Sequence, residues 1–225
     1  MPIKRAFNCL VLFLISALSM IVQAQERIEL ADGSVLNVFV TEAESSEDAN
    51  PLVILMGGGP GNASISRDTA QWLGSGFAAR GWHVAVPISP NNRSFRGAVN
   101  NEKIELLIAE LQLRETIRSD KVLLAGVSNG GMSALEIASR NPENYLGVAA
   151  VPALFTAGNT GSELEGFKIY LRIGGQDQLG WAERFDETVS NLNEAGAQLD
   201  AEILDGAPHM FRMDWSTLGP WLENL

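Results

Sequence analysis

Cysteine and histidine are scarce in this chain of 225 residues, which holds one cysteine, Cys9, and two histidines, His83 and His209. A single cysteine excludes a disulfide framework and a cysteine-rich zinc site. Basic residues are also few, since 16 Lys and Arg stand against 27 Asp and Glu, for a net charge of −11. A surface with this excess of negative charge repels phosphate backbones, so we expect no nucleic acid partner.

Long hydrophobic runs are absent except at the N-terminus. There an apolar run over residues 9–22 follows Lys4 and Arg5 and ends in Val22-Gln23-Ala24, a small-x-small cleavage pattern. This three-part pattern predicts a signal peptide over residues 1–24, cleaved after Ala24, and therefore a secreted or periplasmic protein. A buried N-terminal helix and an uncleaved anchor are the alternatives, and an uncleaved anchor would be the only membrane contact.

Residues 25–225 are expected to form one domain, because the chain is 46% hydrophobic and 19% charged, as in ordinary globular proteins. Short apolar runs alternate with helical periodicity, which predicts an α/β fold: a mostly parallel sheet with helices on both faces. The expected strands are 27–30, 35–40, 52–56, 82–86, 122–125, 146–151, 169–173 and 199–204. The expected helices are 65–80, 101–117, 130–140 and 181–195.

The segment Gly126-Val127-Ser128-Asn129-Gly130-Gly131 lies between an expected strand and an expected helix. It matches G-x-S-x-G, in which glycines permit a turn too tight for a Cβ atom and the serine stands above the sheet. The start of the following helix favours negative charge on a reacting oxygen. Ser128 is therefore the candidate nucleophile, and a serine that only caps the helix is the alternative.

A second glycine segment, residues 57–61, follows the third expected strand. We expect the N–H groups of Gly58 and Gly59, together with that of Asn129, to bind an oxyanion. A phosphate-binding loop would need Gly-Lys-Ser/Thr here, and a dinucleotide site would need glycine where Asn62 stands. We therefore expect no nucleotide cofactor, and a loop that merely turns the chain is the alternative.

The base and the acid follow from position along the chain. His83 lies inside an expected strand and is assigned a structural role, whereas His209 follows the last strand, at the sheet edge where α/β active sites form. Asp177 lies one short turn beyond another strand, which makes it the candidate acid. The rival acids are too near His209 in sequence or belong to a helix and its exit: Asp205, Asp214, Asp186 and Asp200.

With these residues in the order Ser128, Asp177, His209, the sequence resembles the α/β-hydrolases over residues 27–225. The serine motif is similar to that of polyhydroxybutyrate-depolymerase-like and feruloyl-esterase-like enzymes. Residues 173–211 resemble the acid–helix–strand–histidine end of dienelactone-hydrolase-like and carboxylesterase-like enzymes. The resemblance implies an α/β-hydrolase fold, in which Ser128 is the nucleophile, His209 the base and Asp177 the residue that orients the base.

One position departs from the pattern: Met56 stands where many lipases and esterases have histidine before the glycines, so the resemblance leaves the outer oxyanion donor open. A cap usually inserts after the sixth strand of this fold, and here residues 152–168, 17 in number, leave room for no large cap domain. We expect an open site. Apolar side chains after strand ends or beside the three candidate residues are predicted to line its substrate pocket: Leu154, Phe155, Trp181, Met210 and Phe211.

Taken together, these features predict an exported serine hydrolase that cleaves carboxylic esters through an acyl-enzyme intermediate, without metal or cofactor. The expected substrate is a small ester, neutral and partly apolar. Hydrolysis of thioester, lactone or peptide bonds is an alternative reaction. A protein that keeps the fold but only binds is the alternative of another class, because a fold alone does not prove an activity.

Overall fold

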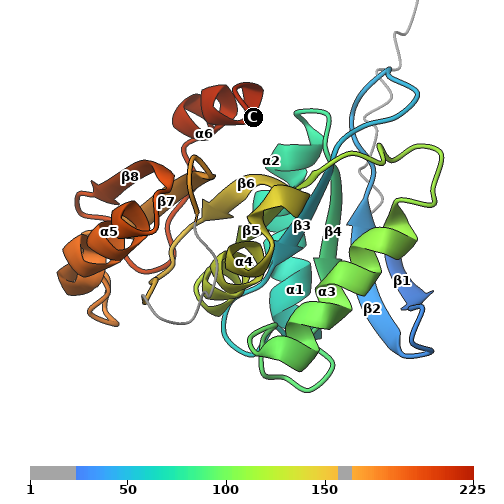
Figure 1. The fold of residues 1–225 in the computed structure, drawn as a ribbon, viewed down its shortest axis with the longest axis horizontal. Coiled ribbons are helices and arrows are strands. Elements are labelled where there is room, and N and C mark those ends of the chain that lie inside the picture. The colour runs from blue at the N-terminus through green and yellow to red at the C-terminus, as the bar shows by residue number, and fades with distance from the viewer. Residues whose placement is uncertain (1–23, 157–163) are drawn as a thin grey trace, which may run out of the picture.

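The computed structural model describes residues 24–156 and 164–225, so residues 1–23 of the predicted signal peptide lie outside the described part. The described residues form one eight-stranded sheet with the order β1-β2-β4-β3-β5-β6-β7-β8 (Figure 1). Its strands are β1 (Ala24–Glu29), β2 (Val35–Thr41), β3 (Leu52–Met56), β4 (His83–Pro87), β5 (Val122–Gly126), β6 (Tyr145–Ala150), β7 (Lys168–Gly174) and β8 (Gln198–Leu204).

The strands from β4 to β8 in the sheet order run parallel to their neighbours within that set, whereas β2 is antiparallel to both β1 and β4. The first two strands form a hairpin, whose turn contains Gly33 with a φ of 78°. A backbone with positive φ favours glycine, so the Asp32-Gly33 turn has the residue it requires. The expected mostly parallel sheet with an antiparallel edge is confirmed.

Helices cover both faces of the sheet, as expected. Helices α3 (Ala98–Leu111), α4 (Asn129–Arg140) and α5 (Phe185–Glu194) lie on one face, and the segment α1–η1–α2 and helix α6 (Trp215–Glu223) on the other (Figure 1). That segment comprises α1 (Ala63–Thr69), the π-helix η1 (Ala70–Gly74) and α2 (Ser75–Ala78). Two short 3-10 turns are η2 (Pro142–Asn144) and η3 (Ala182–Arg184).

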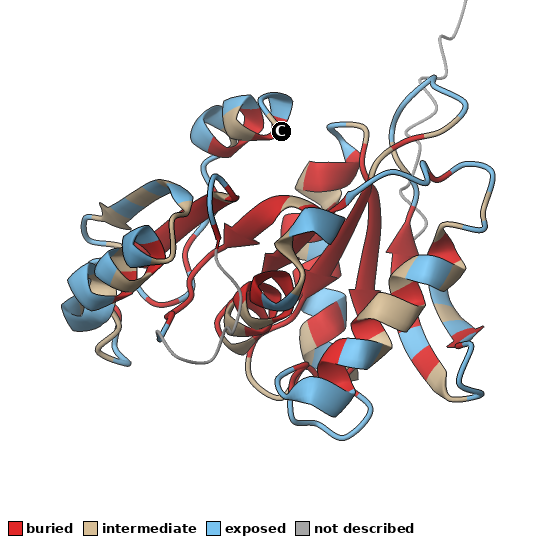
Figure 2. Ribbon diagram, in the orientation of Figure 1, coloured by how far each residue is buried: buried red, intermediate tan, exposed pale blue. Residues whose placement is uncertain are grey.

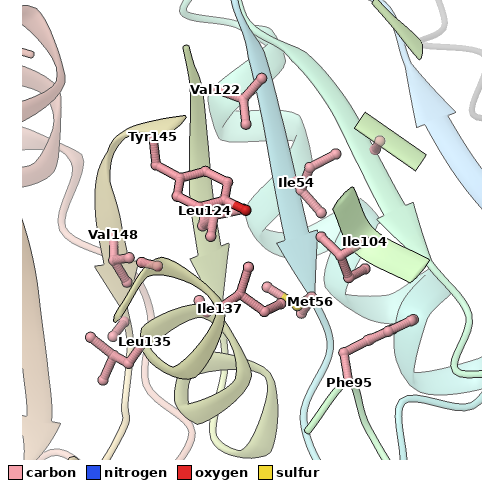
Figure 3. Packing of buried hydrophobic residues seen from close by; sticks show 14 of the residues in the cluster. Ile54, Met56, Phe95, Ile104, Val122, Leu124, Leu135, Ile137, Tyr145 and Val148 are labelled. Atoms are coloured by element: carbon pink, nitrogen blue, oxygen red, sulfur yellow. The ribbon is translucent and has the colours of Figure 1, made fainter. Parts of the chain in front are cut away.

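The central strands are buried on both faces, so their side chains feed two separate cores (Figure 2). In β3, Ile54 and Met56 belong to the core under α3 and α4, while Val53 and Leu55 belong to the core under α1–η1–α2. Figure 3 shows the first of these cores, with Met56 of β3 beside Ile137 of α4. The alternation explains why these strands are continuous apolar runs, because successive side chains point to opposite faces.

Three elements differ from the sequence expectations. The expected helix over 65–80 is not a continuous α-helix, because the π-helix η1 (Ala70–Gly74) separates α1 from α2. Helix α3 ends at Leu111 instead of residue 117, and the chain turns so that Ile117 is buried.

The third difference is helix α6, which the sequence did not predict because it contains Gly219 and Pro220, two residues that disfavour helix interiors. Its first turn is capped by the side chain of Asp214, which accepts a hydrogen bond from the Ser216 N–H at 2.8 Å.

The connection between β6 and β7 holds no helix in residues 151–156 and 164–167, the parts of it that the structure describes. In the described ranges no helix combines the length and apolar character needed to cross a membrane.

Candidate active site

Ser128 lies in the tight turn between β5 and α4, with φ 55° and ψ −118°. This is a strained conformation for a residue with a side chain, costing about 1–3 kcal/mol, and such strain is concentrated at functional sites. The flanking glycines make the turn possible. A Cβ on Gly126 would collide with the backbone of Gly130, and a Cβ on Gly130 would collide with the carbonyl group of Met56.

Ser128, His209 and Asp177 form one chain of hydrogen bonds. The Ser128 Oγ lies 2.9 Å from His209 Nε2, and His209 Nδ1 lies 2.7 Å from Asp177 Oδ2. The second carboxylate oxygen, Asp177 Oδ1, accepts a hydrogen bond from the Leu179 N–H at 2.7 Å. The Asp177 side chain is 0% exposed and that of His209 is 7% exposed. An acceptor-only carboxylate at Nδ1 fixes the tautomer in which Nε2 accepts the serine proton.

The loops that carry Asp177 and His209 are tied to each other. A Cβ on Gly174, at the end of β7, would collide with the carbonyl group of Pro208, so the two backbones lie in direct contact. The Gln178 side chain adds a second tie, since its Oε1 accepts the His209 N–H at 3.1 Å. The indole of Trp181 stands edge-on to the imidazole, with 4.8 Å between ring centroids. These contacts fix the ring of His209 from several sides.

The expected oxyanion donors lie beside Ser128. The Asn129 N–H is in the first turn of α4, where a helix provides no acceptor of its own. Gly58 lies against the serine, since a Cβ there would be 3.4 Å from Ser128 Cβ. Gly59 instead directs its carbonyl group to the Asn129 side chain, whose Nδ2 donates to it at 3.0 Å. The amide of Asn129 thus ties the glycine loop to the start of α4.

A cavity of about 530 Å³ opens beside the serine and the histidine. It is lined by residues from the glycine loop, one face of α1–η1 and the two loops that carry Asp177 and His209: Gly58, Gly59, Ile65, Asp68, Thr69, Trp72, Ser128, Leu179, His209 and Met210. Leu179 and Met210 are large apolar side chains that remain 58% and 50% exposed at its rim.

Of the five side chains predicted to line a substrate pocket, only Met210 lines this cavity. Leu154 and Phe155 are buried in the core under α3, α4 and α5, and Phe211 is buried in the other core. Burial alternates along residues 209–213, so Phe211 points into the protein where Met210 points out. Trp181 contacts the ring of His209 and stays outside the cavity lining.

The sequence analysis missed the cavity wall supplied by α1–η1. Ile65 and Trp72 stand at helical spacing, which in the sequence alone indicates core packing. Leu179 was missed as well, although it stands only two residues after Asp177.

His83 is buried in β4 and lies apart from this site, in line with the structural role assigned to it. Its Nε2–H donates to the carbonyl oxygen of Thr116 at 2.8 Å. Burial lowers the pKa of His83, and the hydrogen bond to Thr116 raises it in part. Over residues 24–156 and 164–225, no group of three or more His, Cys, Asp and Glu side chains is placed to hold a metal ion.

No protein-family model and no curated protein sequence matches the chain. Several solved structures are similar. Dipeptidyl peptidase 4 of Porphyromonas gingivalis shares 12% identity at a TM-score of 0.66, over 91% of this chain and 35% of that protein. A predicted CIB-like hydrolase of Thermoplasma acidophilum shares 17% identity at a TM-score of 0.62, over 92% of this chain and 100% of that protein. Esterase PE8 shares 20% identity at a TM-score of 0.67, over 84% of this chain and 98% of that protein. This chain therefore spans about a third of the peptidase and nearly all of the other two, and the likeness is one of fold.

Proposed function

We propose that this chain, which has the α/β-hydrolase fold, is a serine hydrolase that cleaves carboxylic esters through an acyl-enzyme intermediate. The observation that carries the proposal is the chain of two hydrogen bonds from Ser128 through His209 to Asp177, at 2.9 and 2.7 Å. In this geometry a serine hydroxyl is next to an imidazole nitrogen that can take its proton, and a buried carboxylate orients the imidazole.

The proposed reaction has two halves. In the first, Ser128 Oγ attacks the ester carbonyl carbon while His209 Nε2 takes the hydroxyl proton, and Asp177 stabilises the imidazolium. The N–H groups of Asn129 and Gly58 bind the oxyanion. Collapse of the tetrahedral intermediate breaks the ester C–O bond, and the leaving alcohol takes the proton from His209. In the second half, water attacks the acyl-enzyme, gives its proton to His209, and releases the acid and free Ser128.

The apolar side chains of the cavity wall support the proposal of an ester rather than a peptide substrate. A peptide substrate presents backbone N–H and C=O groups that lose hydrogen bonds when an apolar wall covers them. Ile65, Trp72, Leu179 and Met210 form such a wall. Hydrolysis of peptides, thioesters and lactones should therefore be measured beside ester hydrolysis. If none of these substrates is hydrolysed, the alternative is that the protein only binds a ligand.

A fluorophosphonate probe tests the nucleophile in the purified full chain. We expect covalent labelling at Ser128 and hydrolysis of p-nitrophenyl esters, measured over a series of acyl chain lengths. The variant Ser128→Ala should lose labelling and about 10⁴-fold or more of kcat while staying folded. Ser190 is an exposed serine on α5, so Ser190→Ala is the matched control and should behave as wild type. Absence of labelling, or hydrolysis that persists in Ser128→Ala, would contradict the proposal.

Export is a separate part of the proposal, supported by the basic, apolar and small-x-small segments of residues 1–24. Cleavage after Ala24 would leave Gln25–Glu29 of the edge strand β1 to pair with β2, from Gln25 opposite Phe39 onward. The mass of the protein recovered from its native host tests this. A chain that begins at Gln25 agrees with export, and a chain that retains residues 1–24 favours the anchor.

A further inference from the structure

We infer that the cavity beside Ser128 selects esters that carry an alkylammonium group, which Asp68 and Trp72 bind. The inference rests on the proposed function and goes further, because it names the substrate's charge. It differs from the sequence-based expectation of a neutral substrate, and the experiment below compares the two. Among the described residues that line the cavity, Asp68 is the only carboxylate.

The helix face that forms the cavity wall places a carboxylate next to an indole. Ile65, Asp68, Thr69 and Trp72 all line the cavity from α1–η1. Asp68 and Trp72 are four positions apart, and residues at this spacing are neighbours on a helix surface. A cation held between them would gain both the charge of the carboxylate and the attraction of the aromatic face, for which Trp is the strongest partner.

The carboxylate of Asp68 is exposed, and within the described residues it has no hydrogen bond or ion pair. The neighbouring Arg67 does not neutralise it, because its guanidinium lies 5.6 Å from the centre of the Phe39 ring. Within residues 24–156 and 164–225, no Lys or Arg lines the cavity. Since the whole chain also carries a net charge of −11, the cavity attracts cations and repels anionic substrates.

The apolar part of the wall decides which kind of cation fits. A metal ion needs several oxygen, nitrogen or sulfur ligands, and one carboxylate does not supply them. A trimethylammonium or similar alkylated group presents methyl groups as well as charge. The methyl groups can pack on Ile65 and Met210 while the positive centre faces Asp68 and Trp72, so the two properties of the cavity are used at once.

The test uses matched ester pairs that differ only in charge. One pair has a trimethylammonium or an isosteric tert-butyl group at the end of the acyl chain of a p-nitrophenyl ester. The other pair has the same difference in the alcohol, as in choline esters and their carbon isosteres. The measured quantity is the ratio of kcat/KM between the cationic and the neutral member of each pair, in the full chain.

We expect the wild type to prefer the cationic member of at least one pair by roughly three- to tenfold. Asp68→Asn should bring that ratio close to one, and Trp72→Leu should reduce it in part. Raising the salt concentration to about 1 M should also reduce it, because charges are then screened within about 3 Å. Asp48 is an exposed carboxylate in the loop before β3, at the opposite edge of the sheet, so Asp48→Asn is the matched control and should keep the wild-type ratio.

A wild-type ratio near one in both pairs would overturn the inference, and so would a preference that Asp68→Asn retains. If either result is obtained while the neutral esters are hydrolysed normally, only this inference fails and the proposed function stands. If no ester of either charge is hydrolysed and Ser128 is not labelled, the proposed function and this inference fail together.

Discussion

Replacing Gly131 with alanine has two opposite effects on stability: it improves helix propensity and it worsens packing. Gly131 lies in the first turn of α4, where alanine is better than glycine by about 1 kcal/mol on propensity alone. A Cβ at this position would be 2.6 Å from the carbonyl oxygen of Pro152, which also accepts the Ser128 N–H at 2.8 Å. The substitution therefore acts on the backbone that holds Ser128, the proposed nucleophile.

The required displacement follows from these distances. Real Cβ atoms essentially never approach other atoms within 3.0 Å, so the Pro152 carbonyl or the helix must move by at least 0.4 Å, from 2.6 to 3.0 Å. Backbone atoms block the movement on two sides, because the Gly126 carbonyl oxygen is itself 3.0 Å from the added Cβ. Overpacking of this kind costs about 1–3 kcal/mol, so packing outweighs propensity.

We expect Gly131→Ala to lower the free energy of unfolding by roughly 1 kcal/mol, the difference between the packing cost and the propensity gain. A misplacement of 1 Å in an active site can cost about 10²-fold in rate, so a shift of about half that size should lower kcat by roughly tenfold. Urea unfolding measures the first quantity, and p-nitrophenyl ester kinetics with active-site titration by a fluorophosphonate measures the second.

Gly219 provides the matched control, because it is also a helical glycine and the nearest atom to an added Cβ is the Arg80 Nε at 3.6 Å. Gly219→Ala has room, so it should stabilise the protein by up to about 1 kcal/mol and leave kcat unchanged. If Gly131→Ala is as stable and as active as wild type, the reasoning from the contact with Pro152 is refuted.

Three further predictions concern single side chains. Asp177→Asn should lower kcat by roughly 10³–10⁴-fold, because the amide favours the wrong histidine tautomer, whereas Asp205→Asn should change it little; reversed kinetics would show that the acid is misassigned. Because burial holds the pKa of His83 below its ordinary 6.5, the unfolded state takes up the proton first, and stability falls as pH drops below 6.5. This contribution changes the free energy of unfolding by up to about 1.4 kcal/mol per pH unit, and His83→Gln should lack it. Urea unfolding at pH values above and below 6.5 measures the slope of that free energy against pH. A slope that is the same in His83→Gln and in the wild type would contradict the prediction. Asn129→Ala removes the hydrogen bond to the Gly59 carbonyl, so kcat should fall roughly tenfold with little change in KM; a change in KM alone would assign the amide to substrate binding.

The sequence could predict that Ser128, Asp177 and His209 lie at one edge of the sheet, because each lies in the turn or loop that follows a strand. In a parallel sheet the carboxyl ends of neighbouring strands share one edge, so local patterns suffice to bring such residues together. The ring contact of Trp181 and the tie from Gln178 depend instead on how two loops fold over each other, which no local pattern encodes.

The cavity wall was beyond local patterns for a related reason. Ile65 and Trp72 have the spacing of a buried helix face, and only the wider π turn η1 and the packing of α1 on the sheet show which side chains face the serine. Leu154 and Phe155 show the opposite case, since they follow a strand end but turn into the core. Position along the chain predicted which three side chains meet, and tertiary packing decided what surrounds them.

The base of the proposed triad is attached to the least protected strand of this half of the sheet. In the described structure β8 is the terminal strand, paired only with β7, and its side chains are half-buried or exposed throughout. Edge elements with few buried contacts open locally at a lower free energy than the whole domain. When β8 detaches, His209 leaves Ser128 while the central strands stay folded. Amide hydrogens of β8 should therefore exchange at denaturant concentrations where activity is already lost and those of β5 are still protected.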